Sequence, residues 1–342
     1  MITGIALQDK DDSHERHNTV WKSALASAVR DPQHLLKLLD LDEKKYLDQV
    51  SLSEQFKVLV PLSYVAKMKK GDWHDPLLRQ VLPLKAEGIK AFGFLSDPVG
   101  DLNAEVSSGV LQKYHGRVLL ITTGACAVHC RYCFRRHFPY VNSVPDKVQW
   151  QQTLAGIKSD ETITEVILSG GDPLMLSDVR LRAMCQDLAD IPHVTTLRFH
   201  TRVPLFLAER LTPHFIQWLS ELTIKIVMVM HANHANELDN EFEISMTKLL
   251  RIGVTLLNQS VLLKNINDDA DKLVLLSQRL FECGILPYYL HQLDKVQGAA
   301  HFEVSNDKVK RLQQQLRERL PGYLVPRFVR EVSGKRYKQP LE

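Results

Sequence analysis

Three cysteines lie within eight residues of one another, where Cys126, Cys130 and Cys133 form the pattern Cys-x3-Cys-x2-Cys. Thiolates are ligands of structural zinc and of iron–sulfur clusters. Structural zinc needs four protein ligands, so His129 or His137 would have to complete such a site. Three cysteines on a cubane cluster instead leave one iron without a protein ligand, and that iron can bind a small molecule. The motif therefore indicates either an iron–sulfur enzyme or a non-catalytic zinc-bearing interaction module.

The setting of these cysteines resembles the radical S-adenosylmethionine superfamily, because an aromatic residue, Tyr132, precedes the last cysteine and an apolar strand-like run precedes the loop. The resemblance implies a 4Fe–4S cluster whose open iron holds the amino and carboxylate groups of S-adenosylmethionine. Electron transfer to this cofactor then releases a 5′-deoxyadenosyl radical. Such a radical can take a hydrogen atom from an unactivated carbon.

Longer segments resemble the lysine 2,3-aminomutase family over roughly residues 70–342. The segments are KYHGRVLLITTGACAVHCRYCFRRHFPY, LSGGDPLM, LRFHTRVP, GVTLLNQSVLLKNIND, PYYLHQLDKVQGAAHF and PGYLVPRF. The similarity is greatest to the short bacterial branch that supplies β-lysine for modifying elongation factor P, in part because the chain ends soon after Lys338. The resemblance implies an isomerase that converts L-α-lysine to (R)-β-lysine. It also implies pyridoxal 5′-phosphate as a cofactor, which the protein positions for the amino-group migration.

The same resemblance implies roles for three groups of residues. Contacts to S-adenosylmethionine fall to Gly170, Gly171, Asp172 and His200. Pyridoxal phosphate is expected to be attached to Lys338, with its phosphate held by Lys113, Arg117 and Gln259. The substrate carboxylate is expected to bind Arg135, whose guanidinium suits a carboxylate, and the substrate side-chain ammonium to bind Asp294 and Glu331.

Two of these positions depart from the family pattern. The glycine-rich run before the pyridoxal lysine is degraded here, which leaves Lys335 as a rival to Lys338. Glu331 stands where the family has an aspartate, and its alternative interpretation is an ordinary surface residue. These departures leave the attachment lysine and the exact substrate open.

A repeated strand–loop–helix pattern is expected to position these groups. Six apolar, β-branched runs predict strands at Val118–Thr123, Glu165–Ser169, Thr196–His200, Ile224–Met230, Val254–Ser260 and Leu286–His291. Amphipathic stretches predict helices at Ser177–Leu188, Glu237–Leu250, Asp271–Cys283 and Asn306–Leu320. Buried parallel strands alternating with helices indicate an α/β fold, either a barrel or a doubly wound sheet. The family resemblance implies a partial (β/α)6 barrel of the TIM-like type. Barrels and doubly wound sheets both place functional groups at the carboxyl ends of the strands.

The chain is expected to divide into three parts. Residues 1–95 predict a helical accessory region, in which Asp31 caps a helix that Pro32 begins. Residues 96–320 form the radical S-adenosylmethionine core, and residues 321–342 form a tail that carries the pyridoxal phosphate lysine.

The composition of the chain excludes some classes of binding partner. The 342 residues carry a formal net charge of +3 and show no long basic stripe, so we expect no nucleic-acid partner. No apolar run is long enough to span a bilayer and no signal pattern begins the chain, which predicts a cytoplasmic protein without a membrane partner. Free L-lysine is the expected substrate, with a functional link to elongation factor P and its β-lysine ligase. Direct action on a protein-bound lysine, or a radical enzyme of another class without pyridoxal phosphate, such as one modifying RNA, are the alternatives.

Overall fold

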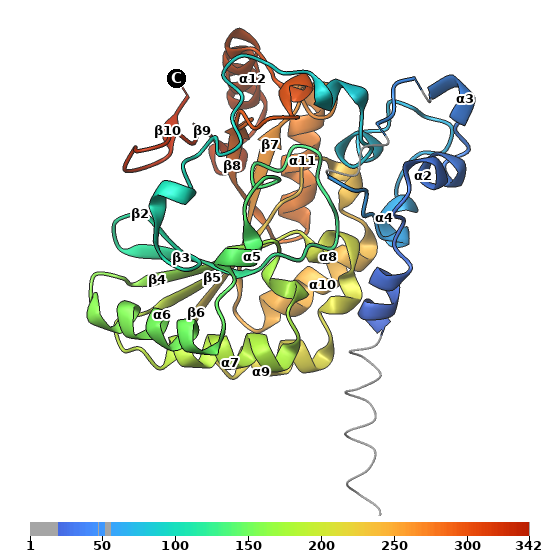
Figure 1. Cartoon of the computed structure of the whole chain (residues 1–342). Helices are drawn as coiled ribbons and strands as arrows, with labels where there is room; N and C mark the ends of the chain where they lie inside the picture. Colours follow the sequence, from blue (N-terminus) through green and yellow to red (C-terminus); the bar gives the residue numbers. More distant parts are fainter. Residues whose placement is uncertain (1–19, 47, 52–55, 342) are drawn as a thin grey trace, which may run out of the picture.

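The computed structural model describes residues 20–46, 48–51 and 56–341 (Figure 1). Its centre is a ten-stranded sheet in which the strands follow one another in chain order. The six predicted strands form its parallel part: β3 (Arg117–Thr123), β4 (Glu165–Gly170), β5 (Thr196–Thr201), β6 (Lys225–Met230), β7 (Thr255–Leu262) and β8 (Leu286–Gln292). In β4 and β6 both faces are largely buried, which explains their near-continuous apolar sequence. The predicted fold class is confirmed.

Helices connect these strands on the outer side of the sheet (Figure 1). They are α6 (Lys147–Ser159), α7 (Asp178–Ala189), α9 (Pro213–Ser220), α10 (Asn240–Arg251), α11 (Ala270–Glu282) and α12 (Asn306–Arg319). Four were predicted, whereas α6 and α9 were not. Asp146 begins α6 by accepting a hydrogen bond from the backbone N–H of Gln149 at 2.8 Å. Within the described part of the chain, none of the helices combines the length and the apolar character that a membrane span requires.

Short edge strands, which the sequence pattern did not predict, curl the sheet into a partial barrel. Strands β1 (Glu105–Ser107) and β2 (Val110–Tyr114) add antiparallel to β3, while β9 (Arg327–Arg330) adds parallel to β8 and β10 (Gln339–Pro340) antiparallel to β9. The hydroxyl of Tyr114 on β2 donates a hydrogen bond of 2.6 Å to Glu331, which follows β9. A side-chain contact therefore links the two edges of the sheet.

The described part of the N-terminal region is helical over residues 20–26 and then contains α2 (Pro32–Leu38), α3 (Glu43–Tyr46), α4 (Leu62–Val65) and the 3-10 turns η1 (Leu78–Gln80) and η2 (Lys85–Gly88). Asp31 caps α2 by accepting from the N–H of His34 at 2.8 Å, as predicted. The hydrophobic core continues from Trp21 and Leu77 in this region to Phe215 in the barrel. The boundary near residue 95 stays a prediction, and the core crosses it.

Candidate active site

The cysteine loop, residues 124–137, follows the carboxyl end of β3, where a barrel of this kind places its functional groups. Cys126, Cys130 and Cys133 are free thiols, each partly exposed. Burial raises the pKa of Cys133 to about 11, and the neighbouring Cys130 adds to this effect. Burial likewise raises the pKa of Cys126, with contributions from both other cysteines. The three thiols therefore lie close enough to influence one another, and a bound metal would deprotonate them.

The cysteine loop also contains two histidines, His129 and His137. Among residues 20–46, 48–51 and 56–341, no three His, Cys, Asp or Glu side chains surround one metal-sized position. The Nδ1–H of His129 donates to the carbonyl of Lys57 at 2.8 Å, and the Nε2–H of His137 donates to that of Gln297 at 3.3 Å. Each histidine keeps its second ring nitrogen for a further contact, as zinc-ligating histidines also do.

Residues of the N-terminal region hold the cysteine loop in place. Glu87 accepts hydrogen bonds from the side chains of Arg131 at 2.6 Å and Arg136 at 2.7 Å. We call these three residues the Glu87 clasp. The backbone N–H of Arg131 also donates to the carbonyl of Gln80 at 2.9 Å, and that of His129 to the carbonyl of Leu59 at 3.0 Å. The accessory region is thus a support for the loop that carries the thiols.

The loop after β4 packs directly under the start of the cysteine loop. A Cβ atom added to Gly170, whose φ is +118°, would lie 2.5 Å from the carbonyl oxygen of Thr123, and one added to Gly171 would lie 2.3 Å from that of Ala125. Both positions therefore require glycine. Asp172 accepts hydrogen bonds from the Thr201 hydroxyl at 2.7 Å and from backbone N–H groups after β5. Burial raises the pKa of Asp172 to about 6.

A second group of charged side chains begins at Arg135, next to the last cysteine. Its Nε donates to Asp101 at 2.6 Å, and its Nη1 donates to the hydroxyl of Ser169 at 3.2 Å. Asp101 also pairs with Lys113 at 2.6 Å. Burial alone would raise the pKa of Asp101, but Arg135 and Lys113 outweigh it and hold that pKa below its usual value. Asp101 is therefore a buried carboxylate that fixes two cations, and no motif in the sequence marked it.

Lys338 joins this group through the C-terminal tail. Its Nζ lies 2.5 Å from Glu331, which also accepts from Tyr114 and lies 3.7 Å from Lys113. Burial alone would raise the pKa of Glu331, but Lys338 above all, with Tyr114 and Lys113, holds it below its usual value. Lys335 lies in an exposed turn. The structure thus brings Lys338, and not its rival, to the interior of the barrel.

The remaining wall of this interior carries Asp294 and two histidines. Burial raises the pKa of Asp294 to about 7, an effect that Lys338 opposes and Glu331 strengthens. Burial also lowers the pKa values of His200 on β5 and His291 on β8 far below the usual range, and the nearby charge of Lys338 lowers both further. The Nε2 atom of His200 is buried without a hydrogen-bond partner. Lys338 therefore lies close enough to Asp294, His200 and His291 to act on all three electrostatically.

The three residues expected to bind phosphate are less closely associated. The Nζ of Lys113 is held by Asp101 and by the carbonyl of Val99 at 2.8 Å. Arg117 lies at the start of β3 with its guanidinium 5.2 Å from the centre of the Tyr114 ring. Gln259 lies on β7 beside Tyr289 of β8. Among the described residues, no hydrogen bond or ion pair joins Lys113, Arg117 and Gln259.

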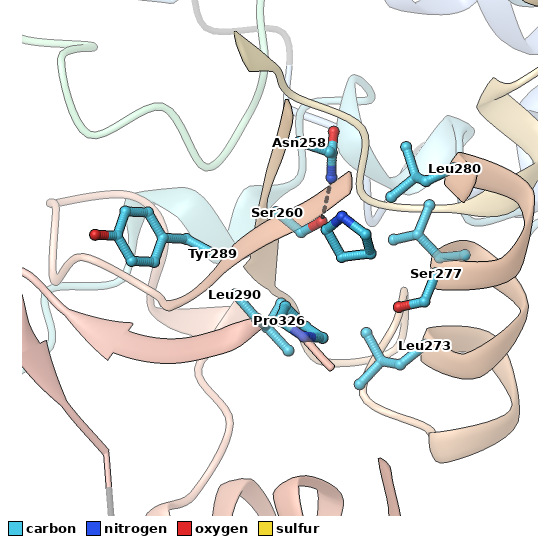
Figure 2. Close-up of a pocket in the computed structure, with 10 residues that line it drawn as sticks. Asn258, Ser260, Leu273, Ser277, Leu280, Tyr289, Leu290 and Pro326 are labelled. Carbon is cyan, nitrogen blue, oxygen red and sulfur yellow. Dashed lines mark hydrogen bonds between the residues drawn. The ribbon is translucent and has the colours of Figure 1, made fainter. Parts of the chain in front are cut away.

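A small cavity lies on the other side of the sheet, between β7, β8 and α11 (Figure 2). Asn258 and Ser260, joined by a hydrogen bond of 2.9 Å, line it together with Ser277 and Leu273 of α11. Its volume of about 10 Å³ matches a single water molecule. It therefore holds no substrate, and the charged residues around Lys338, together with the cysteine loop, remain the candidate active site.

Comparisons with known proteins identify the family. No family model matches the chain. An L-lysine 2,3-aminomutase of Escherichia coli is 47% identical and one of Haemophilus influenzae is 45% identical; these alignments span 94% and 93% of this chain and 94% of each relative. An L-lysine 2,3-aminomutase of Clostridium subterminale is 30% identical, over 94% of this chain and 77% of that protein. The chain belongs to the lysine 2,3-aminomutase family. As a lysine aminomutase it is an isomerase that acts on lysine with a 4Fe–4S cluster, S-adenosylmethionine and pyridoxal phosphate.

Residues of this aminomutase fit those cofactors. The cysteine loop offers three thiols, the number that leaves one iron open, and Lys338 offers a primary amine of the kind that pyridoxal phosphate needs for its attachment. The residues that sequence reasoning missed are Gln80, Glu87, Asp101, Tyr114 and Arg202. Of these, Tyr114 and Arg202 lie in segments that the family resemblance had marked.

Proposed function

We propose that this aminomutase converts free L-α-lysine to (R)-β-lysine inside the barrel, next to the cysteine loop. The observation that carries the proposal is the convergence of Arg135, Lys113, Glu331 and Lys338, with Asp101 between the first two and Asp294 close to Lys338. The site contains cations for a carboxylate, carboxylates for an ammonium and an amine for the cofactor. Those are the groups that lysine and pyridoxal phosphate together require.

Arg135 is proposed to bind the substrate carboxylate. Asp101 and Ser169 fix the plane of its guanidinium, which has five N–H donors and uses two of them in these contacts. The rings of Phe134 and Phe138 lie 4.8 and 6.0 Å from the guanidinium and restrict it further. A fixed fork of this kind suits bidentate recognition of a carboxylate.

Asp294 and Glu331 are proposed to bind the side-chain ammonium of lysine. Asp294 has a pKa of about 7, so an approaching ammonium favours its ionised form. The carboxylate of Glu331 already binds the amine of Lys338, which therefore competes with the substrate ammonium for Glu331. When Lys338 bears the cofactor, Glu331 becomes available to the substrate.

The cofactor contacts are assigned on the same basis. Cys126, Cys130 and Cys133 would bind the cluster, and Gly170, Gly171, Asp172 and His200 would form the wall beside S-adenosylmethionine. Lys338 would carry pyridoxal phosphate, with Lys113, Arg117 and Gln259 around its phosphate. When bound, these cofactors supply the radical and the imine nitrogen through which the amino group migrates, while the chain orients the substrate and excludes water.

We also propose that the product serves the modification of elongation factor P by a β-lysine ligase, in the cytoplasm. The greater identity to the Escherichia coli relative than to the Clostridium subterminale relative supports this branch. Mass spectrometry of elongation factor P from a strain lacking this gene is expected to show loss of the β-lysyl group. An unchanged modification would contradict the biological role and leave the chemistry untouched.

The chemistry is tested on protein purified without oxygen. The spectrum is expected to show an iron–sulfur cluster, and borohydride reduction followed by peptide mapping is expected to place a pyridoxyl group on Lys338. Lys335→Arg should retain the adduct, whereas Lys338→Arg should lose it. Incubation with L-lysine, S-adenosylmethionine and a reductant should yield β-lysine. A colourless protein with stoichiometric zinc, or an adduct on Lys335, would contradict these assignments.

A further inference from the structure

Arg202 lies at the carboxyl end of β5, where it joins three parts of the chain that are distant in sequence. Its side chain is only 9% exposed. Its Nη2 donates to Glu237 at 2.7 Å and to Gln80 of the N-terminal region at 3.2 Å. Its backbone N–H donates to Asp172 at 2.7 Å. The guanidinium is thus fixed by contacts on several sides before any cofactor is considered.

The other terminal nitrogen of Arg202 points to the cysteine loop. Its Nη1 lies 2.6 Å from the sulfur of Cys130 and 2.6 Å from the hydroxyl of Tyr132. Tyr132 is itself held, because its hydroxyl lies 2.6 Å from the amide nitrogen of Asn233. A buried cation therefore donates a hydrogen bond to one of the three sulfurs assigned to the cluster.

We propose that Arg202 is a positioning residue for the iron–sulfur cluster, which orients Cys130 and raises the reduction potential of the cluster. The inference rests on the proposed role of Cys130 as a ligand. Reduction adds one electron from an external reductant to the cluster and breaks no bond. The added negative charge is stabilised by a hydrogen-bond donor and a positive charge next to a ligating sulfur, and the stabilisation is large where water is excluded.

Glu237 gives the proposal an internal check. Its side chain is fully buried and binds the opposite terminal nitrogen of Arg202, as well as the backbone N–H of Asn233 at 2.8 Å. Its negative charge offsets part of the effect of Arg202 on the cluster. Loss of the arginine charge and loss of the glutamate charge should therefore move the reduction potential in opposite directions. A purely structural role predicts no such opposition.

The test is a potentiometric titration of the anaerobically purified holoenzyme with dithionite and redox mediators, in which electron paramagnetic resonance measures the reduced cluster. At the wild-type midpoint, Arg202→Gln is expected to lower the ratio of reduced to oxidised cluster about tenfold, a shift of about 59 mV to more negative potential. Arg202→Lys keeps the positive charge but loses the planar set of N–H donors, so a smaller shift of the reduction potential in the same direction is expected. Glu237→Gln is expected to increase the ratio.

Arg210→Gln is the matched control, because Arg210 is another buried arginine, paired with Asp178 at 2.7 Å, and does not contact a cysteine. It should reduce stability and leave the potential unchanged. If Arg202→Gln binds no cluster, Arg202→Lys decides, and a wild-type potential in that variant overturns the proposal. A Glu237→Gln shift to lower potential overturns it as well. If the wild-type protein itself holds no iron, the ligand assignment fails instead, which separates the two outcomes.

Discussion

Glu87→Gln removes the charge at the centre of the Glu87 clasp and tests whether the N-terminal region stabilises the cysteine loop. Glu87 accepts two hydrogen bonds from Arg131, at 2.9 and 2.6 Å, and one from Arg136 at 2.7 Å. The three side chains are between 3% and 7% exposed. The variant would leave two buried guanidinium groups without a counter-charge. The NH2 group of the new glutamine would also face the N–H donors of the arginines, with which it cannot form hydrogen bonds.

The magnitude follows from this burial. Removing one partner of a buried, hydrogen-bonded ion pair lowers the free energy of unfolding by about 3–5 kcal/mol. Burial alone would raise the pKa of Glu87, but the two arginines outweigh it and lower that pKa. The pKa of a glutamate in the unfolded chain is about 4.3. Because the pKa of Glu87 is lower in the folded protein, its ionised form stabilises the fold above about pH 4.3, and this stabilisation is lost as the pH falls through the folded-state pKa. The difference between wild type and variant should therefore be largest near neutral pH and shrink below about pH 4.

The assay compares thermal unfolding midpoints of the holoenzymes under anaerobic conditions at one scan rate, together with the rate at which a chelator removes iron. Glu87→Gln is expected to unfold at a lower temperature and to lose iron faster. Glu303→Gln is the control, because Glu303 pairs with Lys295 at the surface, where both side chains are more than 40% exposed, and such a pair contributes about 1 kcal/mol or less. Equal midpoints and equal iron loss in wild type and Glu87→Gln would refute the reasoning.

Three further predictions concern the site itself. Gly171→Ala is expected to displace the cysteine loop and lower the iron content per chain, because its Cβ would lie 2.3 Å from a loop carbonyl. The control is Gly156→Ala in α6, whose Cβ would meet no atom within 4 Å and which should retain full iron content and stability. Since Asp294 has a pKa of about 7, the KM for lysine should rise up to tenfold per pH unit below pH 7 in the wild type and lose this dependence in Asp294→Asn; a flat wild-type profile would count against the assignment. Asp101→Asn leaves Arg135 without its carboxylate partner and should raise the KM for lysine more than it lowers kcat, so an unchanged KM would argue against Asp101 as the residue that orients Arg135.

Local patterns were sufficient for the parallel part of the barrel. The strands β3 to β8 span six to eight residues and are mostly apolar, and four of the helices after them have clear amphipathic periodicity. The edge strands were missed because β1 and β10 span only three and two residues and have no periodicity that a sequence can display. They form because the sheet already offers unpaired backbone groups at its edges.

The sequence by itself determined the class of chemistry, since Cys126, Cys130 and Cys133 lie within a single loop and the segments around them resemble the lysine 2,3-aminomutase family. Tertiary structure alone decided what surrounds that loop. Glu87 and Arg131 are 44 residues apart, Asp101 and Arg135 are 34 apart, and Arg202 and Cys130 are 72 apart. The energy of such pairs depends on burial and on distances of a few ångströms, and neither quantity exists until the barrel has folded.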